Sequence, residues 1–179
     1  MGRLTRLGMC LLLAACGAVP GEPAAVPAPS EDGFPAIPFG PSEELAQLHE
    51  SARELATLRP PRGSEDVWAR DVYTPWMQER TELIALAMRL RRIARSQSNA
   101  PAVVAGLHAE LLRHTADSLD NLDLSEALAE AVKEPVSSLR ERAIRTYEVC
   151  YEAALSAGPA YDGWHRLCGA GLAALSEEP

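Results

Sequence analysis

Apolar residues recur at helical spacing along most of this chain, and this pattern restricts the fold more than any other feature. From Ser42 onward no stretch alternates β-branched and polar residues as a strand would. The clearest apolar stripe advances in steps of three and four through Val136, Leu139, Ala143, Tyr147, Cys150 and Ala154. A period of 3.6 residues indicates amphipathic helices that bury one face each, so we predict an all-α fold.

Helix start and stop signals divide residues 42–179 into segments joined by short loops. The signals are the capping residues Ser42, Thr74, Asn99 and Asp162 and the breakers Pro60-Pro61 and Gly158-Pro159. Pro135 lacks the amide hydrogen that a helix interior needs, so we expect a kink or a restart there. The segments predict one domain, an antiparallel bundle of four to five helices.

Length and charge narrow the possible functions. The chain has 179 residues, enough for one domain with a sizeable core. Its formal net charge is −8 at pH 7, whereas nucleic-acid binding depends on lysine and arginine side chains that neutralise phosphates. We therefore expect no nucleic-acid partner.

The first fifteen residues have the layout of an export signal. Arg3 and Arg6 precede a nine-residue apolar run, and small residues follow. As a helix this run would rise about 14 Å, too short for the roughly 30 Å hydrocarbon layer of a membrane. Residues 1–15 are thus predicted to be a signal peptide and not a membrane span.

The end of this signal, Leu13-Ala14-Ala15-Cys16, resembles the lipobox of bacterial lipoproteins. That resemblance implies cleavage before Cys16, lipid on its thiol and anchoring in a bacterial membrane, because several acyl chains on one residue hold stably. Gly17 stands where an Asp often signals inner-membrane retention, so the resemblance implies the outer membrane in a cell with two membranes. An ordinary secretory signal followed by a chance cysteine is the alternative.

Residues 16–41 are rich in proline, with Pro20, Pro23, Pro27, Pro29, Pro35, Pro38 and Pro41 among glycine, alanine and serine. Proline at this density opposes both helix and sheet pairing and favours extended backbone. We predict a disordered tether here, reaching on the order of 75 Å when extended.

Two of the four cysteines are left after signal cleavage and lipidation, Cys150 and Cys168. An exported domain folds in an oxidising compartment. Counted from the loop between their helices, the two positions lie about 12 Å and about 9 Å along antiparallel neighbours. This match in height predicts a Cys150–Cys168 disulfide; two buried free thiols are the alternative.

No catalytic, metal or cofactor motif emerges from the sequence. His108, Glu110, His114 and Asp117 are the best metal candidates, but only the last three share a helix face and no His-Glu-x-x-His pair is present. We expect a solvated polar face with one ion pair instead, and predict no metal, no cofactor and no catalytic residue.

Arg89, Arg91, Arg92 and Arg95 cluster near the predicted end of one helix. They suit either anionic lipid headgroups or an acidic partner. The simpler interpretation is that arginine side chains near a helix C-terminus complement its dipole and cover apolar neighbours.

Tyr151, Ala154, Leu155, Pro159, Trp164 and Leu167 resemble the join between two tetratricopeptide repeats. Such repeats recur every 34 residues, and 34 residues before Trp164 the chain has Glu130, so a second copy is missing. A peptide-binding repeat therefore stands only as an alternative.

These features favour a membrane-anchored, non-enzymatic helical lipoprotein that binds or scaffolds another protein of the cell envelope. A carrier with a small ligand or cofactor inside its bundle is the second hypothesis. An envelope enzyme with dispersed catalytic residues is the third.

Overall fold

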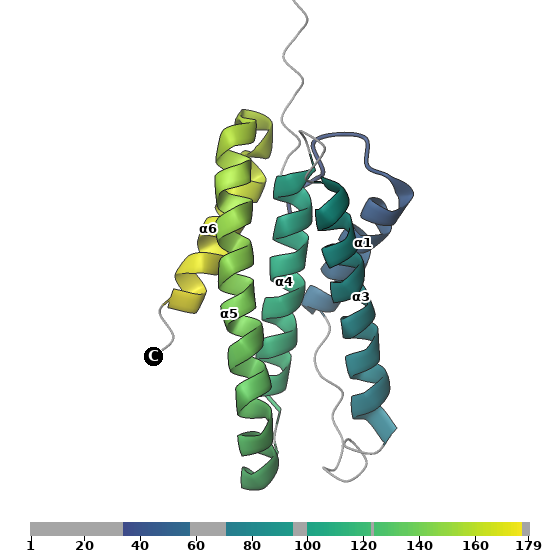
Figure 1. The fold of residues 1–179 in the computed structure, drawn as a ribbon, viewed down its shortest axis with the longest axis vertical. Helices are drawn as coiled ribbons and strands as arrows, with labels where there is room; N and C mark the ends of the chain where they lie inside the picture. Colours follow the sequence, from purple (N-terminus) through teal and green to yellow (C-terminus); the bar gives the residue numbers. More distant parts are fainter. Residues whose placement is uncertain (1–33, 58–70, 95–99, 123, 177–179) are drawn as a thin grey trace, which may run out of the picture.

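The computed structural model describes residues 34–57, 71–94, 100–122 and 124–176. Within them the chain forms five α-helices and one 3₁₀ turn, and no strand. The helices are α1 (Glu43–Thr57), α3 (Tyr73–Ala94), α4 (Pro101–Asp120), α5 (Glu126–Ala157) and α6 (Asp162–Ser176), with the 3₁₀ turn η2 at Pro159–Tyr161. Successive helices run in opposite directions along the bundle (Figure 1). The predicted all-α bundle is confirmed.

Helix α4 is the centre of the bundle. It contacts α1, α3, α5 and α6, and most of its residues are buried. Its sequence explains this position, because small and aliphatic residues such as Ala102, Val103, Leu107 and Leu112 occur on several sides of the helix. Apolar residues on more than one side are buried only when several other elements cover the helix.

Local sequence signals set several helix ends as predicted. Ser42 accepts a hydrogen bond from the backbone amide of Leu45 at 3.3 Å, which caps α1. Helix α5 ends at Ala157, and Gly158 follows with a φ of 90°, a conformation that residues with a side chain rarely adopt. Asn99 lies outside the described residues, and α4 begins instead at Pro101, a residue suited to a first helical position.

The predicted restart at Pro135 is wrong. Helix α5 continues through Pro135 for 32 residues, and Figure 1 shows it as one uninterrupted helix. Pro135 and Ala131, whose carbonyl group loses its usual hydrogen bond, are both exposed. Water can hydrogen-bond to that carbonyl oxygen, which lowers the cost of a proline at this position.

Residues 34–39 pack against the helices, although the sequence placed them in the Pro-rich tether. Phe34 is buried beside the ring of His49, and Ile37 and Phe39 contact the same core. The Trp164 indole donates a hydrogen bond to the carbonyl oxygen of Ala36 at 3.0 Å, and His49 contacts that of Pro35 at the same distance. This segment is therefore fixed to both α1 and α6, and His49 of α1 helps to hold it there.

Candidate functional site

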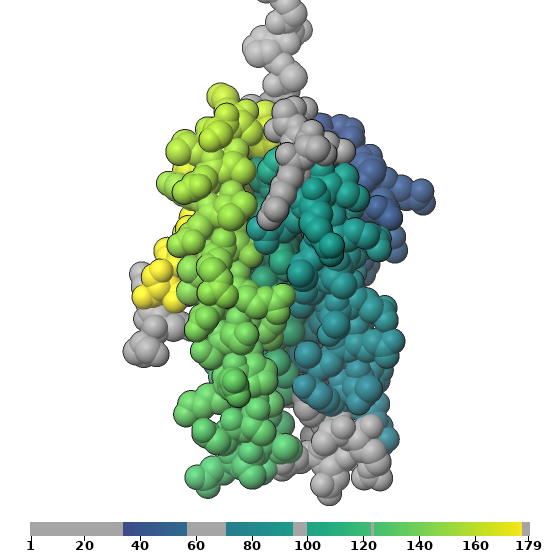
Figure 2. All heavy atoms as spheres, in the orientation of Figure 1, coloured from purple at the N-terminus to yellow at the C-terminus, as the bar shows by residue number. Residues whose placement is uncertain are grey.

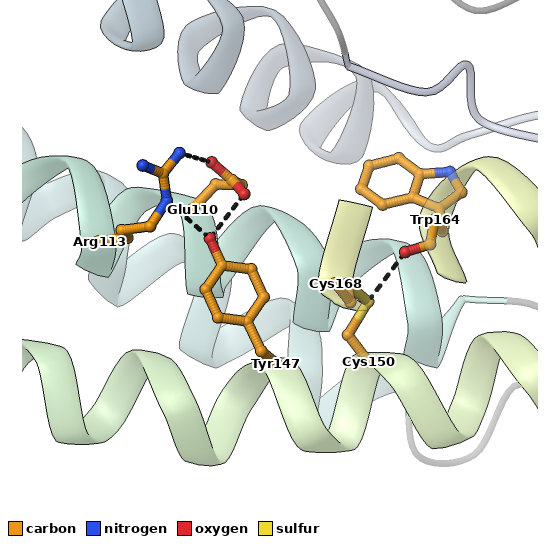
Figure 3. The surroundings of a disulfide bond; sticks show 6 residues. All are labelled: Glu110, Arg113, Tyr147, Cys150, Trp164 and Cys168. Carbon is orange, nitrogen blue, oxygen red and sulfur yellow. Dashed lines mark hydrogen bonds and ion pairs between the residues drawn. A yellow bond between two sulfur atoms is a disulfide. The ribbon is translucent and has the colours of Figure 1, made fainter. Parts of the chain in front are cut away.

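Cys150 of α5 and Cys168 of α6 form the predicted disulfide. Their Cα atoms are 6.1 Å apart, within the usual range for a disulfide, and both side chains are fully buried. The sulfur of Cys150 lies 3.9 Å from the carbonyl oxygen of Trp164, a contact and not a hydrogen bond because an oxidised sulfur has no proton (Figure 3). A disulfide this deep in the core stabilises the α5–α6 pair and is closed to large redox partners.

Two glycines allow α4, α5 and α6 to approach closely around the disulfide. A Cβ atom on Gly106 of α4 would lie 2.7 Å from Cε3 of the Trp164 ring and 3.2 Å from the sulfur of Cys150. A Cβ atom on Gly171 of α6 would lie 2.7 Å from Cε2 of Tyr147. Both distances are too short for a side chain, so glycine is needed at each position for this packing.

A group of charged residues lies one helical turn further along the same face of α4. We call it the Glu110 cluster, and it comprises Glu110, Arg113, His114, Asp117 and Tyr147. Figure 3 shows Arg113, Glu110 and Tyr147 pointing toward one another beside the disulfide. The Tyr147 hydroxyl donates to Glu110 Oε1 at 2.6 Å, and Arg113 donates from Nη2 to Glu110 Oε2 at 2.7 Å and from Nε to the Tyr147 oxygen at 3.0 Å.

The buried carboxylate of Glu110 is matched by a guanidinium and hydrogen-bond donors. Burial favours a raised pKa for Glu110, but the hydrogen bond from His114, the charge of Arg113 and the hydrogen bonds from Tyr147 and Arg113 together hold this pKa below its usual value. Burial raises the pKa of Tyr147, and the negative charge of Glu110 raises it further. The carboxylate is thus ionised, the phenol neutral, and Glu110 is only 3% exposed. This arrangement joins α4 to α5 through the buried side chains of Glu110 and Tyr147.

The expected solvated face of His108, Glu110, His114 and Asp117 is wrong in part. Glu110 is buried beneath α5, and His108 is buried where α3 and α5 meet over α4. His108 turns away from Glu110 and His114, as its position in the helix predicts. Among the described residues no group of three or more potential ligands could hold a metal ion.

His108 belongs to a second polar group, which lies between α3 and α5 on another side of α4. We call it the His108 cluster, and it comprises Met88, Arg91, His108, Arg142 and Thr146. Arg91 Nη1 lies 3.1 Å from His108 Nδ1 and donates to the Thr146 hydroxyl at 3.3 Å. Burial lowers the pKa of His108 to about 4, and the charges of Arg91 and Arg142 contribute to this shift.

The predicted arginine cluster separates in the structure. Arg91 is directed into the bundle toward His108, whereas Arg89 pairs with Glu44 of α1 at 3.3 Å on the surface. Arg92 is exposed, beside an open surface hollow that Arg89 and Ile93 also line, and Arg95 lies outside the described residues. Arg91 is therefore separated from Arg89 and Arg92, which line the same surface hollow.

Sequence reasoning missed the two arginine-centred groups. The only signal for the first was the spacing of Glu110, Arg113 and Asp117, which places opposite charges one turn apart. Its partner Tyr147 comes from another helix and no local pattern identifies it. The second group joins three helices, so no spacing within one helix could reveal it.

Cys16, the predicted lipidation site, lies outside the described residues. Among the described helices, none has the length and the hydropathy that crossing a membrane requires. Helix α5 alone spans 32 residues, nearly the whole 34-residue period of a two-helix tetratricopeptide repeat, which disfavours that alternative.

Comparison of the chain with protein-family models, with curated proteins and with solved structures finds no match. Arguments about function therefore depend on the residues and their geometry.

Proposed function

We propose that this chain is a lipoprotein of the bacterial cell envelope, anchored through lipid on Cys16, whose helical domain binds another envelope protein without catalysing a reaction. The observation that carries the proposal is the buried Cys150–Cys168 disulfide in a chain that begins with a lipobox-like signal. Disulfides persist in oxidising compartments, so the disulfide supports export on grounds independent of the signal.

The surface of the domain supports a binding role. Among the described residues, the large apolar side chains that are substantially exposed are Met88 (42%), Ile93 (49%), Val149 (43%) and Leu155 (65%). Glu110 and Tyr147, in contrast, are buried and hydrogen-bonded to each other. The exposed apolar side chains offer a partner protein surface to contact.

The anchor is tested by replacing Cys16 with serine. We expect the native protein to begin at Cys16 and to carry fatty acid by mass spectrometry, and to fractionate with membranes. Cys16→Ser should move it out of the membrane fraction. A mature protein that begins elsewhere and carries no fatty acid contradicts this part of the proposal.

The partner is tested by crosslinking in cells. A photoreactive residue at Ile93 or at Leu155 should capture one reproducible envelope protein. Lys133, whose side chain is 75% exposed on the opposite end of α5, is the matched control position and should capture none. Equal labelling from Ile93, Leu155 and Lys133, or no crosslink from any of them, contradicts the binding role.

A further inference from the structure

The His108 cluster contains a buried hydrogen-bond donor that has nothing to donate to. The Arg91 guanidinium is always protonated and can only donate, so the Nδ1 atom of His108 must accept its hydrogen bond. A neutral imidazole then carries its single proton on Nε2. That Nε2 atom is buried and has no hydrogen-bond partner in the described part of the chain. Buried donors of this kind are rare, because an unmade hydrogen bond inside a protein is costly.

Two contacts between α3 and α5, one helical turn apart, hold the two arginines that act on His108. In the first, Arg91 of α3 reaches Thr146 of α5. In the second, Arg142 Nη2 of α5 lies 3.9 Å from the sulfur of Met88 on α3. Arg142 and Thr146 are four residues apart, so they share a face of α5, and both arginines act electrostatically on His108. Figure 2 shows α3 and α5 side by side along this face of the molecule.

The Arg142 guanidinium has no strong acceptor among the described residues. Arg142 makes no ion pair with any carboxylate there, and its one hydrogen-bond partner is a thioether sulfur, a weak acceptor. A guanidinium in this position is suited to receive a negative charge from elsewhere.

We propose that the His108 cluster binds an oxyanion, the phosphate or carboxylate group of a small ligand, held by the guanidinium of Arg142 and the Nε2–H of His108. An oxyanion accepts hydrogen bonds from both groups at once, which satisfies the buried donor and neutralises the arginine. Arg142 would exchange a weak contact with Met88, whose side chain is 42% exposed, for a charge-assisted hydrogen bond to the oxyanion. The site is independent of the lipid anchor and of the proposed protein partner.

The test uses the full mature protein in nonionic detergent micelles, titrated with inorganic phosphate and, separately, with acetate at constant ionic strength. We expect saturable binding by calorimetry and a saturable shift of the His108 Nε2 nitrogen resonance. Arg142→Met should weaken affinity about tenfold or more, the effect of losing one charge-assisted hydrogen bond. Arg145→Met is the matched control, because Arg145 is an exposed residue of the same helix whose partner is Glu141. It should change affinity less than about twofold, as expected for an exposed ion pair.

Vesicles of phosphatidylglycerol mixed with phosphatidylcholine separate the two sources of phosphate. Vesicle binding that inorganic phosphate displaces identifies a lipid headgroup as the ligand, whereas binding of phosphate alone identifies a soluble one. Absence of saturable binding of either anion, or equal loss of affinity in Arg142→Met and Arg145→Met, overturns the proposal. If Arg142→Met does not fold, the His108 resonance of the unmodified protein decides, and a resonance that does not respond to either anion overturns it.

Discussion

Helix α4 presents two polar groups to its neighbours, and they differ in charge balance. The Glu110 cluster, on the side facing α5 and α6, pairs a carboxylate with a guanidinium and a phenol. The His108 cluster, on the side between α3 and α5, combines two guanidiniums with a neutral imidazole. Glu110 follows His108 by two positions, but their side chains point to different sides of the helix because successive residues advance by about 100°.

The difference distinguishes a structural cluster from one that can accept a ligand. In the Glu110 cluster each hydrogen-bonding group of Glu110 and Tyr147 has a partner, and the adjacent glycines and the disulfide fix the helices tightly. In the His108 cluster a donor is unsatisfied and one arginine contacts only a thioether. Polar residues in a core stabilise it when their network is complete, and an incomplete network requires an explanation.

Removing the carboxylate should produce the largest loss of stability. Glu110→Leu leaves Arg113 as a partly buried charge without its main partner and removes the acceptor of Tyr147, so we expect a loss of about 3–5 kcal/mol in unfolding free energy by urea denaturation. Asp117→Asn removes a more exposed partner of the same arginine, 31% exposed, and should cost less than about 1 kcal/mol. Similar losses in both variants would mean that the Glu110–Arg113 ion pair is not stronger than the Asp117–Arg113 ion pair.

The pH dependence of stability should separate the two clusters. The folded pKa of His108 is about 4, below its ordinary value of 6.5, so between these values only the unfolded chain takes up the proton. Stability should therefore fall by roughly 3 kcal/mol as pH decreases from 6.5 to 4. Glu110 has a lowered pKa, so its stabilisation is present above pH 4.5, its ordinary value, and is lost as pH falls below it.

The variant His108→Gln checks this assignment. It should flatten the dependence of unfolding free energy between pH 6.5 and pH 4.5 and leave the decline at lower pH. An unchanged slope in that upper interval would assign the titration to other groups and remove the basis for a neutral, buried His108.

Removing the disulfide, which lies beside the Glu110 cluster, should lower the unfolding free energy by about as much as protonating His108. Cys150 and Cys168 are 18 residues apart, and closing a loop of this size stabilises a fold by about 3 kcal/mol in the chain-entropy model. The double variant Cys150→Ala, Cys168→Ala should lower the unfolding free energy by that amount. In the unmodified protein, mass spectrometry after thiol alkylation should find both cysteines protected under native conditions. Rapid alkylation would contradict a buried disulfide.

Adding a methyl group at Gly106 should show how tightly α4 packs against α6. Gly106→Ala places a Cβ atom against Trp164 and should cost about 1–3 kcal/mol, the usual effect of overpacking. Gly40→Ala is the control, because a Cβ atom there meets nothing within 4 Å and should change stability by less than about 0.5 kcal/mol. Equal effects would mean that α4 and α6 do not approach as closely as described.

The sequence was sufficient to predict what periodicity and local chemistry determine. Helical stripes, caps and breakers predicted the bundle, and the equal heights of Cys150 and Cys168 predicted the disulfide. The error at Pro135 came from applying a local rule without knowing that this turn of α5 is exposed to solvent. Tertiary exposure decides whether water can take over the lost hydrogen bond.

The polar clusters could not be predicted because they depend on which helices meet. Tyr147 lies 37 residues from Glu110, and Thr146 lies 55 residues from Arg91. Each of these residues, taken alone, fits an ordinary amphipathic helix. The same reason explains His49 and Trp164, whose role in holding residues 34–36 depends on contacts between distant parts of the chain.

If Cys16 carries the lipid anchor that we propose, the contact of Ala36 with Trp164 decides where a tether would end. The chain between Cys16 and Phe34 could then span at most about 55 Å, instead of the about 75 Å expected for a tether that ends at Pro41. The volume that the domain can search shrinks with the cube of this length, to less than half. A shorter tether raises the effective concentration of the domain near the bilayer and favours partners that are themselves close to the membrane surface.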